Sequence, residues 1–397
     1  MRLKLSLPKI KLSGVIFLFG LYIKQFYLRE SGSIQIGDVV IALSVLMIFF
    51  SGQVKPGENS LLAIFVFCTF IINGIYSIYY GKNFLKSSVY LLYNLLVVLA
   101  FRLLIREDGF IKVLILLLKI CLTTQLFVFI TGIGRNYSSL RYQGSFNDPN
   151  QFGFFVLCCF FMLFLCYLHF GKRPHILWLL VTGFLVVLSS SRGMMLTFAV
   201  FLFLAVIYPF LSTKSIVERV VFILLFAIIL VFLFVFGDVV SAILQGALGW
   251  RRLAYVFGRI QDTASVSSGT GGRLYKLLAD RQLVRIIRAP YYFLFGCGEG
   301  YFDRFLISSG QNNEIHCSMI ALCYYYGIIP YYFFLKWIRE NIKGIPHSAI
   351  SVFVALIMEA FTLANHRQPL FWMMFAFGSL LSEDKNCINN CCSRESL

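Results

Sequence analysis

The sequence predicts an all-α polytopic membrane protein, and three observations lead to this fold class. Of the 397 residues, 59% are hydrophobic and only 13% are charged, and the mean hydropathy is +0.80. The apolar residues fall in runs of about 17–22 residues, which is long enough for a helix to cross a bilayer. A helix also satisfies all of its backbone hydrogen bonds internally, as a segment within lipid requires.

Charged and turn residues divide the apolar sequence into about twelve expected spans. The first run follows a basic N-terminus, as in a signal peptide, but no small-x-small cleavage site comes after it, so we expect an uncleaved first helix. The expected spans cover residues 12–28, 34–50, 61–80, 87–104, 111–131, 151–169, 175–190, 194–211, 217–236, 317–335, 348–364 and 369–382.

One long polar interval interrupts this pattern and defines the expected regions of the chain. Residues 1–236 would carry the first nine transmembrane helices and residues 316–382 the last three. Residues 237–315 would form a long outer loop, and residues 383–397 a cytoplasmic tail. Lys and Arg near the helix ends favour this orientation, with both termini in the cytoplasm.

The cations of the two predicted sides differ in kind. The cytoplasmic connections carry mostly Lys, whereas the outer side carries mostly Arg. A guanidinium group binds phosphate through two parallel hydrogen bonds and tolerates partial burial better than an ammonium group. We therefore expect a phosphorylated ligand at the outer face; attraction to anionic lipid headgroups is the alternative.

The long outer loop is expected to contain amphipathic helices. Residues 239–260 are typical of a helix that lies in the membrane interface. In residues 273–288, apolar side chains fall on one helical face, while Arg281, Arg285 and Arg288 fall on another. A solvated charged face is the alternative reading of these three arginines.

The stretch RYQGSFNDPNQFGFF, residues 141–155, contains the start of the sixth expected span. Asp148 and Pro149 suit the N-cap and first positions of a helix, and Gly144 suits a tight turn. Capping does not account for Arg141, because a cation gains nothing from a helix N-terminus.

Two further stretches carry candidate residues for chemistry. LSSSRGMML, residues 188–196, joins two spans by a very short connection and holds Arg192 at the surface; snorkelling is the alternative reading. EIHCSMIALCYYYGIIPYYFF, residues 314–334, places His316 at the outer end of the tenth span. There the helix dipole favours a neutral imidazole, which can accept a proton. Glu299 and Glu314 are alternative bases. The other interpretation of His316 is a polar residue at the membrane edge without a catalytic role.

The cysteines and carboxylates give no metal-binding pattern. The eleven cysteines lack metal-ligand spacing, and Cys297 and Cys317 are expected to be free thiols rather than a disulfide. The outer side has no Asp-x-Asp pair or His and carboxylate cluster that would hold a divalent cation. We expect no metal and no cofactor.

Four of these stretches together carry a family resemblance. RYQGSFNDPNQFGFF, SSSRG, APYYFLFGCGEGYF and IHCSMIALCYYYGIIP, in this order and on one predicted side, resemble the O-antigen polymerase and ligase superfamily (Wzy/WaaL-like). The resemblance covers about residues 141–335, and the expected topology extends it over most of the chain. One departure is Cys317, where many members have Asn after the His.

The resemblance implies a metal-independent glycosyltransferase of the bacterial inner membrane. Its donor would be a glycan on undecaprenyl pyrophosphate. Arg141 and Arg192 would neutralise the leaving pyrophosphate, and His316 would deprotonate or orient the acceptor hydroxyl. The helix with Arg281, Arg285 and Arg288 would gate or hold the donor.

The same resemblance implies partners and leaves the reaction product open. Expected partners are the lipid-linked oligosaccharide, membrane lipid and a chain-length regulator protein, but no nucleic acid. A polysaccharide polymerase is favoured, and a ligase that transfers the glycan to lipid A–core is the close alternative. A flippase or transporter is a third reading. It would use ionisable residues within spans, which here are Lys119 and Glu359, a pair that could contact each other.

Overall fold

The computed structural model describes residues 10–27, 35–51, 59–138, 141–207, 283–305 and 314–394. The expected span at 217–236 and the expected interfacial helix at 239–260 lie outside these residues. So does most of the expected amphipathic helix, including Arg281.

The N-terminal part forms helices where the apolar runs predict them. These are α1 (Leu12–Ile23), α2 (Ile36–Phe50), α3 (Ser60–Tyr80), α4 (Leu85–Ile105) and α5 (Asp108–Ile130). Helix α2 begins with a capping box between Gln35 and Asp38, and α3 ends at Gly81, whose φ of +60° is the left-handed conformation that terminates helices.

A two-stranded hairpin follows α5 and was not expected from the sequence. Strands β1 (Arg135–Ser138) and β2 (Arg141–Gly144) pair antiparallel, and Gly144 has a φ of +60°. Helix α6 (Pro149–His169) comes next. The Asp148 carboxylate caps it by accepting from the backbone N–H groups of Asn150 and Gln151, at 2.7 and 3.2 Å. This confirms the predicted N-cap. The tight turn at Gly144 is confirmed by its positive φ and by the hydrogen bond from the Phe146 N–H to the Gln143 carbonyl.

The middle of the chain continues with α7 (Ile176–Ser189), α8 (Arg192–Leu202) and a π-helical turn at Phe203–Ile207. Only Ser190 and Ser191 separate α7 from α8, so the very short connection is confirmed. After the undescribed residues come three short helices, α14 (Val284–Arg288), α15 (Tyr292–Phe295) and a 3-10 turn at Phe302–Phe305.

The C-terminal part is α16 (Ser318–Tyr326), α17 (Ile328–Ile342), α18 (His347–Thr362) and α19 (Pro369–Arg394). The expected continuous span at 317–335 is wrong in one respect: Gly327, with a φ of +78°, divides it into α16 and α17. Helix α19 continues to Arg394, through most of the expected tail at 383–397, and the location of that tail stays a prediction.

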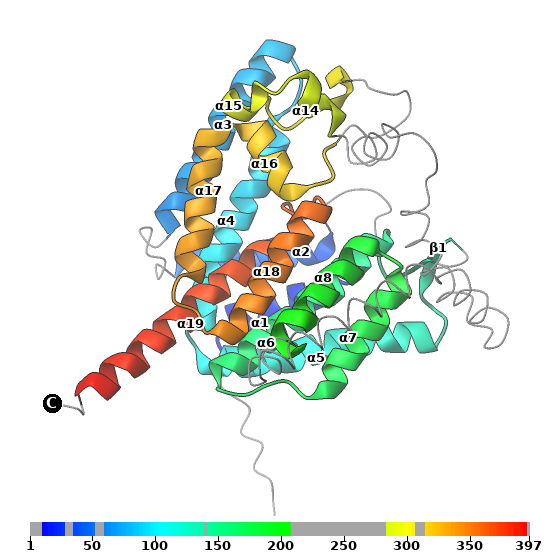
Figure 1. Cartoon of the computed structure of the whole chain (residues 1–397), viewed down its shortest axis with the longest axis vertical. Coiled ribbons are helices and arrows are strands. Elements are labelled where there is room, and N and C mark those ends of the chain that lie inside the picture. The colour runs from blue at the N-terminus through cyan, green and yellow to red at the C-terminus, as the bar shows by residue number, and fades with distance from the viewer. Residues whose placement is uncertain are drawn as a thin grey trace, which may run out of the picture.

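The helices form two groups that meet at the centre of the molecule (Figure 1). Helices α3, α4, α16 and α17 run along the long axis, with α14 and α15 at one end, while α5 to α8 and α18 cross it at an angle. Helix α19 packs against α4, α6 and α17 and so joins the two groups. Helix α6 is the most enclosed of the long helices, with most of its side chains buried.

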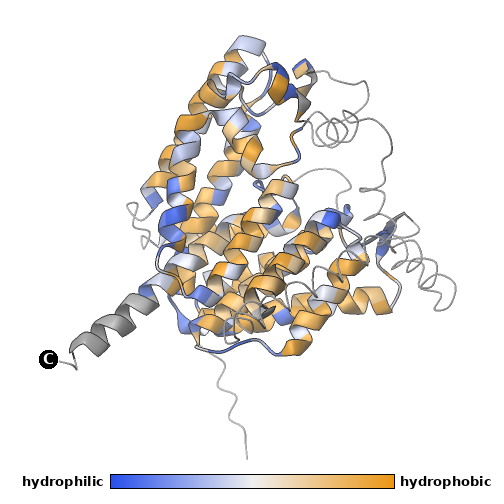
Figure 2. Ribbon diagram, viewed as in Figure 1, coloured by the Kyte–Doolittle hydropathy of each residue, from blue (hydrophilic) through white to orange (hydrophobic). Residues whose placement is uncertain are grey.

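Apolar residues cover these helices, including their exposed faces (Figure 2). Within the described residues, four helices are long and apolar enough to cross a membrane: α3, α4, α5 and α6. Five shorter apolar helices accompany them. The molecule is therefore mostly helical and suited to embedding in a membrane, whereas the number of spans and their orientation stay predictions.

Candidate functional site

A polar pocket forms where three distant stretches of the chain meet. Its volume is about 350 Å³. The start of α6, the segment before α16, and the connection between α18 and α19 supply its lining, which consists of Asp148, Asn150, Gln151, Glu314, His316, Leu363, Ala364, Asn365, Arg367 and Gln368. Two of these stretches, those around residues 148–151 and 314–316, are among the motifs that the sequence singled out.

Asn150 links the pocket to Arg141 and to Ser191, the residue before Arg192; Arg141 and Arg192 are the two arginines predicted to stabilise a leaving group. Its Oδ1 accepts from Nη2 of Arg141 at 3.2 Å and from the Ser191 hydroxyl at 2.8 Å. Arg141 also stacks on Tyr137, with the guanidinium carbon 5.6 Å from the ring centre. Arg192 is the exposed first residue of α8, directly after Ser191. Neither arginine is part of the pocket lining: Arg141 is joined to it through Asn150, and Arg192 follows the residue that binds the same Asn150.

Helix α8 approaches α18 closely beside Arg192. A Cβ atom added to Gly193 would lie 2.7 Å from Oγ1 of Thr362, which is nearer than a normal contact. Thr362 is the last residue of α18, next to the pocket residue Leu363. The glycine therefore allows the Ser-Arg-Gly junction to reach the edge of the pocket.

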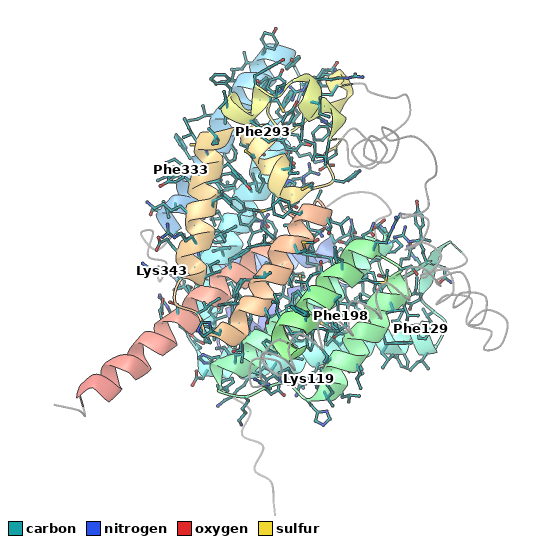
Figure 3. All side chains as sticks on the ribbon, viewed as in Figure 1. Lys119, Phe129, Phe198, Phe293, Phe333 and Lys343 are labelled. Carbon is teal, nitrogen blue, oxygen red and sulfur yellow. The ribbon has the colours of Figure 1, made fainter. Side chains whose placement is uncertain are left out.

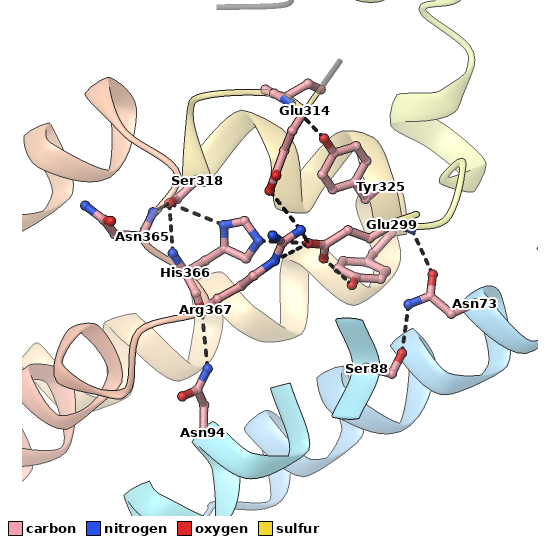
Figure 4. Close-up of polar contacts among 12 residues, drawn as sticks. Asn73, Ser88, Asn94, Glu299, Glu314, Ser318, Tyr325, Asn365, His366 and Arg367 are labelled. Atoms are coloured by element: carbon pink, nitrogen blue, oxygen red, sulfur yellow. Dashed lines mark hydrogen bonds and ion pairs between the residues drawn. The ribbon is translucent and has the colours of Figure 1, made fainter. Parts of the chain in front are cut away.

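Arg367 is bound by two carboxylates at the inner wall of the pocket (Figure 4). Its Nε donates to Oε1 of Glu299 at 2.9 Å, and its Nη2 donates to the same oxygen. Nη2 also lies 2.8 Å from Oε1 of Glu314. Burial alone would lower the pKa of the Arg367 guanidinium, but the charges of Glu299 and Glu314 outweigh it and raise that pKa further above its usual value.

Glu299 is the buried centre of this network. Its side chain is 1% exposed, and Oε2 accepts from the Tyr326 hydroxyl at 2.6 Å while Oε1 lies 3.3 Å from Nε2 of His366. Burial would raise the pKa of the Glu299 carboxyl. The charges of Arg367 and His366 and the hydrogen bonds from His366 and Tyr326 prevail and hold the pKa well below its usual range.

The backbone around Glu299 is fixed to the long helices. The Glu299 N–H donates to Oδ1 of Asn73 at 2.8 Å, and Nδ2 of Asn73 donates to the Ser88 hydroxyl at 2.8 Å. On the other side, Nδ2 of Asn94 donates to the His366 carbonyl at 3.3 Å. Helices α3 and α4 thus fix both partners of the ion pair (Figure 4).

Ser318, His366 and Glu299 lie in the order of a serine-hydrolase triad, but their contacts indicate a structural role. Nδ1 of His366 is 3.4 Å from the Ser318 hydroxyl. That hydroxyl donates to the Leu363 carbonyl at 2.9 Å and accepts from the backbone N–H groups of Asn365 and His366. All three side chains are buried. Ser318 therefore fastens the Leu363–Arg367 segment to α16 and is inaccessible as a nucleophile.

Of the predicted donor-binding arginines, Arg285 and Arg288 are not part of this pocket. Arg285 is 2% exposed and stacks on Phe302 and Phe305, with its guanidinium carbon 5.9 and 5.1 Å from the ring centres. Arg288 is exposed at the end of α14, and Arg281 lies outside the described residues. Neither Arg285 nor Arg288 lines the polar pocket. The expected role of these arginines in donor binding is left as a prediction.

Arg304 fastens the segment 297–305 to α3 and to the start of α4. It lies over the rings of Tyr76, Phe84 and Phe305, between 4.5 and 5.2 Å from their centres, and donates to the carbonyls of Cys297 and Gly298. This arrangement places Glu299, one residue after Gly298, against Asn73. Cys297 and Cys317 are both free thiols, as expected.

A second cavity, of about 650 Å³, lies between α2 and α4. It is mostly apolar. Its lining consists of Asp38, Val39, Ala42, Asn83, Leu85, Lys86, Val89, Tyr90, Tyr93 and Arg367. Arg367 therefore belongs to the wall of both cavities.

Lys119 and Glu359 do not form the pair that the sequence suggested. Lys119 (labelled in Figure 3) lies over the rings of Tyr167 and Trp178, 5.4 and 5.8 Å from their centres. Glu359 accepts a hydrogen bond from Nδ2 of Asn365 instead. The pairing is wrong because α5 directs Lys119 toward α6 and α7, whereas Glu359 faces the connection after α18.

Sequence reasoning missed His366 and assigned no role to Arg367. The signal was present in LANHRQP, residues 363–369, a polar stretch between two apolar runs that ends in a proline. It parallels FNDPNQ, residues 146–151, which we did single out. Among the described residues, no group of three or more His, Cys, Asp or Glu side chains is arranged to hold a metal ion.

Comparison of the chain with protein-family models gives no match, and comparison with curated proteins gives none. The resemblance to the O-antigen polymerase and ligase superfamily therefore rests on the four sequence motifs.

Proposed function

We propose that the protein is a polysaccharide polymerase of the bacterial inner membrane. It would transfer a growing glycan from undecaprenyl pyrophosphate onto a new lipid-linked repeat unit at the outer face. The observation that carries this proposal is the polar pocket, where the motif residues Asp148, Asn150, Glu314 and His316 line one cavity.

The position of His316 supports a role as the general base. It lines the pocket, is partly exposed, and lies two residues before α16 begins. In the proposed reaction its imidazole takes the proton of an acceptor sugar hydroxyl. The hydroxyl oxygen forms a bond to the anomeric carbon of the donor, the bond from that carbon to the pyrophosphate oxygen breaks, and the electron pair leaves with the pyrophosphate. Glu314 is the second candidate base.

The leaving pyrophosphate gains negative charge, and fixed cations lower the barrier where that charge develops. Arg141 is held by Asn150 and Arg192 follows Ser191, which binds the same Asn150. These contacts support the proposal that both arginines face the departing group from the margin of the pocket. Arg367 supplies a third cation within the lining.

The test is glycan length in a host that lacks its own polymerase but carries the matching repeat-unit genes. With the protein present, we expect a ladder of long chains on a gel. Alanine at His316 should collapse the ladder while the protein stays at normal levels in the membrane. A single capped repeat unit in the presence of the intact protein would contradict the proposal.

The ligase alternative uses the same donor and differs in the acceptor. It predicts that the protein adds finished chains to lipid A–core without lengthening them. The transporter alternative predicts that alanine at Lys119 or Glu359 abolishes function while His316→Ala does not. The cation–π position of Lys119 gives that alternative no support, because this side chain is held by Tyr167 and Trp178.

A further inference from the structure

The cavity between α2 and α4 combines an apolar surface with two cations. Val39 and Ala42 come from α2, and Val89, Tyr90 and Tyr93 lie on one face of α4 at helical spacing. Val39 and Val89 are 61% and 55% exposed, so the cavity opens to the outside of the helix bundle. We refer to it as the α2–α4 groove.

The charges of the α2–α4 groove suit an anionic ligand. Lys86 and Arg367 line it, and its single carboxylate, Asp38, is neutralised by Lys24 at 2.5 Å. The Tyr93 hydroxyl also donates to Asp38, at 3.1 Å. A ligand that fits both the charge and the surface would have an anionic head and a long apolar chain.

Arg367 connects the groove to the polar pocket, since its side chain belongs to both linings. Nε and Nη2 bind carboxylates, while Nη1 makes no hydrogen bond within the described part of the chain. The guanidinium side chain remains 20% exposed. A phosphate at this point could therefore reach Arg367 while its apolar chain stayed in the groove.

The two carboxylates that bind Arg367 differ in how easily a ligand can displace them. Glu299 is 1% exposed and is fixed by Tyr326 and His366 as well as Arg367. Glu314 is 14% exposed and lines the pocket, and within the described part of the chain its carboxylate forms an ion pair with Arg367 and no second ion pair. Because phosphate oxygens bind guanidinium as carboxylate oxygens do, a phosphate can replace Glu314 while Glu299 keeps the arginine in place.

We propose that the α2–α4 groove binds the hydrocarbon chain of a polyprenyl pyrophosphate, whose phosphate replaces Glu314 on Arg367. This assignment rests on the proposed function, because the sugar carried by such a lipid would then enter the polar pocket with His316. Glu314, released from Arg367, would face the same pocket.

The test measures binding of undecaprenyl pyrophosphate to the full-length protein in phosphatidylcholine nanodiscs, by native mass spectrometry. Val89→Trp fills the groove without touching the ion pairs. Leu116→Trp is its matched control, because Leu116 on α5 is 54% exposed and lies outside the groove. Arg367→Gln, Arg367→Lys and Glu314→Gln test the head contact, and thermal unfolding confirms that each variant is folded.

We expect Val89→Trp and Arg367→Gln each to weaken binding by about tenfold or more, with Arg367→Lys intermediate and Leu116→Trp unchanged. Glu314→Gln should bind as tightly as the wild type or up to about tenfold tighter, because the phosphate no longer competes with a carboxylate. Undecaprenol, which lacks the phosphate, should bind weakly to every variant. The binding of inorganic pyrophosphate should be the same in Val89→Trp as in the wild type.

Three results would overturn the proposal. Equal binding to Val89→Trp and Leu116→Trp would exclude the groove, and weakened binding to Glu314→Gln would exclude the exchange. Equally tight binding of dioleoyl phosphatidic acid, with the same response to the variants, would identify a general phospholipid site instead. The glycan-ladder assay distinguishes a failure of this proposal from a failure of the proposed function. A normal ladder in cells carrying Val89→Trp would contradict lipid binding in the α2–α4 groove and leave the polymerase function intact. Lipid binding that responds to the variants, together with no ladder from the wild type, would contradict the polymerase function alone.

Discussion

Arg367 has a buried side and a pocket side, and the two sides differ although each presents a carboxylate to the same guanidinium group. On the buried side, Glu299 accepts hydrogen bonds from Tyr326 and Arg367, and its carboxylate also lies next to the imidazole of His366. On the pocket side, Glu314 lines an open pocket together with His316, and its ion pair among the described residues is with Arg367. The buried region positions the arginine, and the open region leaves part of it available to a ligand.

This difference separates side chains that build the site from those that would act in it. A buried charge that loses its partner is costly, because its desolvation is no longer compensated. A partly exposed charge that loses its partner is solvated by water and costs little. Substitutions on the buried side of Arg367 should therefore affect mainly stability, and substitutions on its pocket side should affect mainly function.

The largest expected effect comes from Glu299→Ala. It leaves the buried side of Arg367 and the Tyr326 hydroxyl without their acceptor, and breaking a buried ion pair costs about 3–5 kcal/mol. We expect a large loss of folded protein, measured by thermal unfolding of the purified protein in detergent. Glu314→Ala is the matched control, and a loss of stability equal to that of Glu299→Ala would show that the two regions do not differ.

A smaller effect is expected from Ser318→Ala. The change removes the acceptor of the Asn365 and His366 backbone N–H groups, and a buried donor left unsatisfied costs about 1–3 kcal/mol. Unfolding measurements should show this loss, and Ser318→Thr, which keeps the hydroxyl, should recover part of it. Unchanged stability of Ser318→Ala would contradict the structural role of this serine.

Acid should weaken the buried region through Glu299. Burial opposes ionisation of this carboxyl, but Arg367 and His366 hold its pKa below the usual value in the folded protein. Its contribution to stability is thus fully present above the unfolded-state pKa of about 4.3 and is lost as the pH falls below that value toward the depressed folded-state pKa. Unfolding between about pH 6 and pH 3 should be less acid-sensitive in Glu299→Gln than in wild type. An equal slope would show that another group dominates.

The smallest expected effect is that of Asp148→Ala at the start of α6. The carboxylate caps the helix through Asn150 and Gln151, and loss of such a cap typically costs about 1 kcal/mol. Asp148→Asn should recover most of the stability, because Asn caps nearly as well. If Asp148→Asn loses glycan polymerisation at full stability, then Asp148 contributes its charge to the pocket as well as a cap.

Local signals in the sequence predict most of the fold and part of the site. The apolar runs locate the helices, and the Asp148-Pro149 pair locates the N-cap and the first residue of α6. The break at Gly327 and the hairpin at residues 135–144 were missed, because hydropathy does not report a single left-handed glycine or a short strand pair in a connection.

The buried half of the site could not be predicted from local patterns. Glu299 and His366 are 67 residues apart, and only tertiary packing brings them together. Arg285 shows the converse: its helical spacing suggested a ligand-facing charge, whereas the fold buries it among the rings of Phe302 and Phe305. Charge patterns identify candidate cations, but packing decides which of them reaches a pocket.

The most direct measurement compares His316→Ala with Ser318→Ala, two residues apart at the start of α16, in the glycan-length assay. We predict that His316→Ala abolishes the ladder while the unfolding temperature stays at the wild-type value. Ser318→Ala should keep the ladder at a permissive temperature despite its lower unfolding temperature. A full ladder from His316→Ala would contradict the claim that the polar pocket is the site of glycan transfer.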